Sequence, residues 1–200
     1  MKINFQKIKK QFPKKWISKI SPLYFNVAQK QTNKEYFTNT DNYFHPCRDT
    51  FDASVTEWFD GMLFPPNIAI LDYIIKNIKF FSGKRIIDNG TGIGILPIFI
   101  DKLGIDCLGY DNGDQVNDKY DELVYNYNKM FKKNILLTQN IPKTTDHDVV
   151  TSSGIWVDDI TTAKMYILDA RWVAKCFPDL KVSYEKKCEY PELIEIYKKT

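Results

Sequence analysis

The chain has 200 residues, of which 44% are hydrophobic and 26% are charged, and its formal net charge is +3. This length suits one domain with a sizeable core, and the composition is that of a globular protein rather than a disordered or disulfide-rich one. No apolar stretch approaches the roughly 20 residues that cross a bilayer, and four cysteines without a CxxC pair, beside two histidines, argue against a zinc site. We therefore expect a cytoplasmic protein with reduced thiols, no transmembrane segment and no metal.

Residues 1–20 carry seven lysines interleaved with apolar residues, and Pro13 interrupts any long helix there. Such a segment can touch a membrane surface or a nucleic-acid backbone with its basic side. It can equally dock its apolar residues on the domain and leave the lysines in solvent. We favour docking because the cluster is short and the overall charge is low.

Residues 21–65 are rich in aromatic and polar residues and show no strand alternation, with one short helix predicted over 53–62. A second helix is predicted from Asn67 to about Phe80, after Pro65 and Pro66. We therefore predict that 1–65 form an aromatic-rich N-terminal extension or lid, packed on a domain of residues 66–200.

The next stretch, residues 85–112, reads as strand, glycine turn, helix and strand. Ile86 and Ile87 form a short apolar run that ends at Asp88, as in a buried parallel strand. A turn with three glycines follows, then an apolar helical run over 95–103 that contains Pro97 in its first turn. A second strand ends at Asp111, roughly 20 residues after the turn, the spacing at which an acid can hold ribose hydroxyls.

The remainder predicts a helix over 115–132, a third strand at 135–137 and a fourth at 148–152. Apolar positions over 161–177 then predict a helix, followed by strands at 181–185 and 193–197. The expected fold is α/β, a Rossmann-like, mostly parallel sheet with helices on both faces.

Asp88, Gly90, Gly92 and Gly94 give the pattern D-x-G-x-G-x-G. This resembles motif I of the class I S-adenosylmethionine-dependent methyltransferases. The resemblance implies that the glycine loop passes under the amino-acid part of the cofactor and that the first acid serves its methionine end. It also implies that Asp111 takes both ribose hydroxyls. A dinucleotide fingerprint would need a third glycine at the position of Ile95.

The resemblance also implies a sheet with three strands after the fourth, the last one antiparallel. Because only 46 residues follow Gly154, we expect an abbreviated C-terminal part with a missing strand or an unusual strand order. The strand ends meet around one crevice, and the expected S-adenosylmethionine-binding residues are Asp88, Gly90, Thr91, Gly92, Gly94, Asp111, Asn112, Asn140 and Ile141. No catalytic residue is assigned.

The sequence thus predicts an S-adenosylmethionine-dependent methyltransferase. Residues 152–156 lack both the proline motif of base-amine methylases and the cysteine of cytosine methylases, so we favour a small-molecule acceptor, and a nucleic-acid partner has no support from a motif. Three alternatives stay open: a non-catalytic S-adenosylmethionine-binding partner subunit, a nicotinamide-dependent oxidoreductase, and an RNA-binding protein that uses the basic N-terminus.

Overall fold

The structure is a computed structural model, and it describes residues 3–20, 63, 65–91, 94–111, 125, 128–129, 131–132, 136–137, 148–153, 163–170, 173, 184–190 and 193–200. The predicted helix over 53–62 lies outside these residues. Within the predicted helix over 115–132, the described residues 125, 128, 129 and 131 are helical, whereas Lys132 is a turn residue with a φ of 56°.

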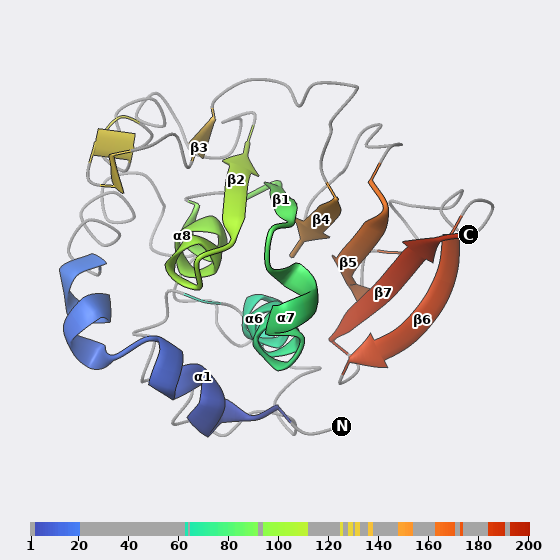
Figure 1. The fold of residues 1–200 in the computed structure, drawn as a ribbon, viewed down its shortest axis with the longest axis horizontal. Coiled ribbons are helices and arrows are strands. Elements are labelled where there is room, and N and C mark those ends of the chain that lie inside the picture. The colour runs from blue at the N-terminus through green and yellow to red at the C-terminus, as the bar shows by residue number, and fades with distance from the viewer. Residues whose placement is uncertain are drawn as a thin grey trace, which may run out of the picture.

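A seven-stranded sheet organises the molecule, in the order β3-β2-β1-β4-β5-β7-β6, and Figure 1 shows the strands side by side in this order. Its strands are β1 (Arg85–Asn89), β2 (Asp106–Tyr110), β3 (Leu136–Leu137), β4 (Val149–Ser152), β5 (Met165–Asp169), β6 (Tyr184–Tyr190) and β7 (Ile194–Lys199). The pairs from β3 to β5 are parallel, and among the described strands β7 runs antiparallel to both of its neighbours. The predicted Rossmann-like α/β fold is therefore confirmed.

The C-terminal part of the sheet is not abbreviated, so that prediction was wrong. Three strands follow β4, and the last of them in the sequence is the antiparallel one. The error lies at β5, which the sequence reading placed inside a helix over 161–177. All five residues of β5 are buried, and a strand covered on both faces has no alternation that separates it from a buried helix. Residues 170 and 173 are helical, as that reading predicted for them.

Both faces of the central strands β4 and β5 are buried, and neighbouring residues of these strands alternate between two apolar clusters. Val149 of β4 belongs to the larger cluster, together with side chains of the helices, whereas Val150 belongs to the smaller one. Met165 and Tyr166 of β5 divide in the same way. This period of two is that of an extended chain between two layers.

The labelled helices all contribute to the larger cluster, so they cover one face of the sheet. They are α1 (Phe5–Gln11), α6 (Pro65–Lys76), α7 (Ile78–Phe81) and α8 (Ile95–Lys102). Helical Val173 is buried in the smaller cluster on the other face. The single helix predicted over 67–80 is broken at Asn77, whose backbone N–H donates to the Tyr73 and Ile74 carbonyls, at 3.1 Å each, and whose side-chain amide also donates to the Tyr73 carbonyl, at 2.8 Å.

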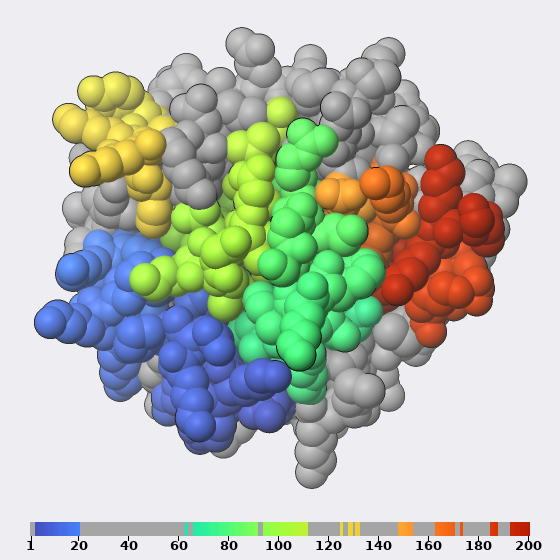
Figure 2. Space-filling view, viewed as in Figure 1, coloured from blue at the N-terminus to red at the C-terminus, as the bar shows by residue number. Residues whose placement is uncertain are grey.

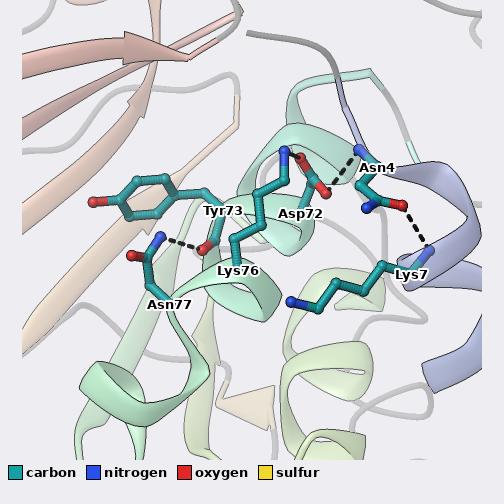
Figure 3. A network of polar contacts seen from close by, with 6 residues as sticks. All are labelled: Asn4, Lys7, Asp72, Tyr73, Lys76 and Asn77. Carbon is teal, nitrogen blue, oxygen red and sulfur yellow. Dashed lines mark hydrogen bonds and ion pairs between the residues drawn. The ribbon is translucent and has the colours of Figure 1, made fainter.

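The N-terminal segment docks on this domain through a buried carboxylate. Asp72 of α6 is fully buried, accepts a hydrogen bond from the Asn4 backbone N–H at 3.1 Å and pairs with Lys76 at 2.8 Å (Figure 3). The Asn4 side chain in turn caps α1 by accepting from the Lys7 N–H at 3.0 Å (Figure 3). The apolar residues of 3–20 therefore dock. The division into 1–65 and 66–200 stays a prediction.

Candidate functional site

The site lies where the strand order reverses, at the carboxyl ends of β1, β2 and β4. From β1 the chain adds β2 and β3 on one side, and β4 then pairs with the other side of β1. A crevice at such a point is where open α/β sheets bind their ligands. The residues that end these strands are therefore the candidate ligand-binding residues.

Asp88 lies near the end of β1, with only 1% of its surface exposed. It stands in register with Thr151 of β4, and the Thr151 hydroxyl donates to Asp88 Oδ1 at 2.8 Å. On its other side, Asp88 is in register with Gly109 of β2, which has no side chain to fill the adjoining space. Asp88 Oδ2 has no hydrogen-bond partner among the residues that the structure describes.

Burial raises the pKa of Asp88 to about 7, and the nearby Asp111 carboxylate raises it further. The hydroxyls of Thr91 and Thr151 act in the opposite direction on this pKa, because they stabilise the ionised form. Thr91 lowers the pKa of Asp88 although its Oγ1 makes no hydrogen bond of ordinary geometry within the described part of the chain. The carboxyl of Asp88 therefore titrates near neutral pH, and a cation beside it would favour the carboxylate.

The glycine turn leaves β1 through backbone conformations that side chains rarely adopt. Gly90 and Gly94 have φ of 67° and 73°, both in the left-handed region. The Thr91 N–H donates to the Tyr110 carbonyl at 3.0 Å, and the Gly94 N–H donates to the Thr91 carbonyl at 3.0 Å. These two bonds fix the turn to the end of β2 and start α8 at Ile95.

Two further polar atoms at this turn are buried without partners. Asn89 Nδ2 and Thr91 Oγ1 make no hydrogen bond with any described residue. Together with Asp88 Oδ2 they place two donor groups and one acceptor within four consecutive residues. Buried polar groups are nearly always satisfied in folded proteins. Three buried polar atoms without a hydrogen-bond partner beside a glycine turn therefore indicate that a polar ligand binds there.

Asp111 follows β2 and is 8% exposed. The register pairs Asn89 with Tyr110, so Asp111 stands beside Gly90 at the same edge of the sheet. Asp88 and Asp111 are close enough for one charge to shift the titration of the other. The structure thus brings together Asp88, Gly90, Thr91, Gly94 and Asp111, five of the nine residues predicted from the sequence. The other four, Gly92, Asn112, Asn140 and Ile141, lie outside the described residues.

Sequence reasoning missed two contacts at this edge. The first is Thr151 on Asp88. The second is Asn67 at the start of α6, whose side-chain amide donates to Ser153 Oγ at 2.9 Å and ties this helix to the end of β4. A signal for the Thr151 contact existed in the predicted fourth strand, because its carboxyl end must lie near that of the first. The register that pairs individual residues was not available from the pattern.

The described residues contain no group of three or more His, Cys, Asp or Glu that could hold a metal ion. No helix among them is long and apolar enough to cross a membrane. The candidate site is therefore a glycine turn with little side-chain bulk between the carboxylates of Asp88 and Asp111. It can bind hydroxyl groups and a cation.

No protein-family model and no curated protein matches the chain. Among solved structures, it is similar to protein 1320 of Thermoplasma acidophilum, with 14% identity and a TM-score of 0.49 over 66% of this chain and 84% of that one. It is also similar to the 16S rRNA methylase RmtB, with 12% identity and a TM-score of 0.46 over 98% and 89% of the two chains.

A third similar structure is the tRNA (uracil-54, C5)-methyltransferase of Pyrococcus abyssi in complex with S-adenosyl-L-homocysteine. It shares 16% identity and a TM-score of 0.41, over 64% of this chain and 37% of that one. At identities and TM-scores this low, the likeness to these proteins carries no argument about activity.

Proposed function

We propose that the chain binds S-adenosylmethionine at the carboxyl edge of β1 and β2 and transfers its methyl group to an acceptor. The observation that carries this proposal is the set of three buried, unpartnered polar atoms on Asp88, Asn89 and Thr91, beside a second carboxylate on Asp111. A ligand that fits must bring both donors and acceptors, and a positive charge suits the two acids. S-adenosylmethionine has ribose hydroxyls, an amino-acid end and a cationic sulfonium.

Four of the described residues then have a definite task. Asp111 accepts hydrogen bonds from the two ribose hydroxyls, which a carboxylate binds more strongly than a neutral acceptor would. Gly90 and Gly94 let the amino-acid part of the cofactor approach the backbone. Asp88 Oδ2 serves the ammonium group of that part, directly or through water. By the resemblance, Gly92 extends the turn, and Asn112, Asn140 and Ile141 line the ribose and adenine.

The cofactor, once bound, supplies an electrophilic methyl group. The chain's own contribution is to hold it in one orientation, because a direct displacement depends on an in-line approach of the nucleophile. The Thr151 hydroxyl keeps Asp88 in place through its 2.8 Å bond. We propose a small-molecule acceptor, since residues 152–156 lack the motifs of base methylation. No catalytic base is assigned.

Each of the two rival functions of this site loses a part of its support. A non-catalytic partner subunit is favoured by a shortened sheet and by the absence of a substrate motif, and the sheet of seven described strands with the antiparallel β7 removes the first of these two supports. A nicotinamide cofactor would need a glycine where Ile95 stands, so that helix and strand can pack closely. Ile95 begins α8 and is 4% exposed, packed in the larger apolar cluster.

A thermal-shift comparison tests the proposal. S-adenosylmethionine and its demethylated product should both raise the melting temperature, because a ligand at 100 times its Kd stabilises the native state by about 2.7 kcal/mol. NAD⁺ should leave it unchanged. Stabilisation by NAD⁺ alone, or by none of the three ligands at millimolar concentration, would contradict the proposal.

A further inference from the structure

The positive charge of this protein is concentrated in its first 20 residues. They hold seven of the chain's 28 lysines and arginines and none of its 25 acidic residues. The other 180 residues, with 21 basic against 25 acidic side chains, carry a net −4. The small net charge of the whole chain is therefore the sum of a strongly basic segment and an acidic remainder. Such an uneven distribution of charge is a property of polyanion-binding proteins.

The apolar side of this segment is already used by the fold. Ile8, Phe12, Ile17 and Ile20 are at most 2% exposed and belong to the larger apolar cluster. The Phe12 ring packs on Phe99 of α8 with centroids 4.8 Å apart. Because the apolar residues are fixed on the domain, they are not available to insert into a lipid layer, as an interfacial amphipathic helix must.

The lysines of the same segment project into solvent. We name five of them the basic surface: Lys7, Lys10, Lys14, Lys15 and Lys19, all of which are exposed. Within the described residues, no ion pair neutralises any of their ammonium groups. The N-terminal segment forms part of the outer surface next to the green α6–α8 region (Figure 2).

The anchoring contacts place the basic surface away from the candidate site. Asn4 contacts Asp72 in α6, near Lys76 where that helix ends, whereas the start of α6 reaches Ser153 at the carboxyl edge. The Trp16 ring lies under the Lys102 ammonium group at 5.6 Å, at the last residue of α8. The surface therefore flanks the amino edge of the sheet.

We propose that the basic surface binds the phosphate backbone of a nucleic acid. Exposed ammonium groups that make no ion pair with any described residue can contact the phosphates of a nucleic-acid strand, and lysines act there as point charges without base readout. Binding is thus sequence-independent. Because the surface lies at the edge of the sheet opposite the crevice, the nucleic acid is a partner that the chain holds. The inference does not rest on the proposed methyl transfer.

Fluorescence anisotropy with a labelled, mixed-sequence, single-stranded 20-nucleotide RNA tests this inference, with DNA of the same sequence as a second arm. Five phosphate contacts give a slope of log K against log salt of about −3.5 for a single strand, hence roughly a hundredfold loss of affinity between 50 and 200 mM salt. No binding at 50 mM salt, or a flat salt dependence, would overturn the proposal. Preference between RNA and DNA identifies the kind of nucleic acid.

Paired substitutions locate the surface. Lys14→Gln with Lys15→Gln should weaken binding about twentyfold at 100 mM salt and flatten the slope by about 1.4, since two contacts are lost. Lys14→Arg with Lys15→Arg should keep both the affinity and the slope of the wild type. The matched control is Lys186→Gln with Lys187→Gln, a pair whose ammonium groups already bind Glu195 and Glu185, and it should change affinity by less than about twofold. Equal losses in both Gln pairs would overturn the assignment.

Vesicles of phosphatidylcholine and phosphatidylserine form the final arm. Binding to these vesicles without binding to either nucleic acid would replace the proposal with a membrane surface. Circular dichroism and urea unfolding of each variant verify that it is folded, because exposed Lys→Gln changes should alter stability by no more than about 0.5 kcal/mol.

Discussion

Replacing Asp88 with asparagine should stabilise the ligand-free protein at neutral and alkaline pH. The pKa of Asp88 rises from 3.8 to about 7 on folding, because the carboxyl is buried. A native state that binds a proton more tightly than the unfolded state loses stability as pH rises between those two values. Three units at 1.36 kcal/mol each give a loss on the order of 4 kcal/mol, fully present above pH 7.

Asparagine has the shape of a protonated aspartic acid and cannot ionise. Its Oδ1 can still accept the Thr151 hydrogen bond. Asp88→Asn should therefore match the wild type near pH 4 and exceed it by about 2–4 kcal/mol at pH 8. Urea unfolding followed by circular dichroism from pH 4 to pH 8 measures both curves.

A control of opposite sign is available at the amino edge. The side chain of Lys164 donates to Asp148 Oδ1 at 3.0 Å and lowers the pKa of that carboxyl. Its stabilising contribution is present above the unfolded pKa and is lost as pH falls, so Asp148→Asn should lower stability at pH 7. A stability difference between Asp88→Asn and wild type that does not change with pH would refute the reasoning.

Three further predictions follow from the same contacts. The affinity for S-adenosylmethionine should rise roughly tenfold from pH 6 to pH 7.5 in calorimetric titrations, because its cationic groups require an ionised Asp88, and this dependence should vanish in Asp88→Asn. Thr151→Val removes the donor to Asp88, so the pH at which the stability loss is complete should move above 7; an unmoved upper limit would mean that the bond does not favour the ionised form. Phe12→Ala should cost about 3–5 kcal/mol in urea unfolding, since the ring is fully buried against Phe99. A cost below about 1 kcal/mol would show that the N-terminal segment is not part of the core.

The central unit of the fold was predictable because its determinants are local. The strand, turn, helix and strand expected over 85–112 appear as β1, α8 and β2, with boundaries shifted by at most one or two residues. Glycine at positions of positive φ, a proline in the first helical turn and an acid at each strand end each have a local physical cause. The same locality explains why Asp88 and Asp111 were found as candidates.

Features that depend on tertiary contacts were not predictable in this way. The strand β5 was missed because burial on both faces removes the alternation that marks a strand. The bond from Asn4 to Asp72 joins residues 68 positions apart, and the bond from Asn67 to Ser153 joins residues 86 apart. Neither pair carries a sequence signal, because each depends on how helices are placed on the finished sheet.

The most direct test of the central claim is calorimetric titration of S-adenosylmethionine into the wild type and into Asp111→Asn, with Asp148→Asn as a folded control away from the site. The account predicts one site per chain, an affinity at least about tenfold lower in Asp111→Asn, or on the order of 1.4 kcal/mol, and no change in Asp148→Asn. Equal affinity in wild type and Asp111→Asn, or no binding to the folded wild type, would contradict it.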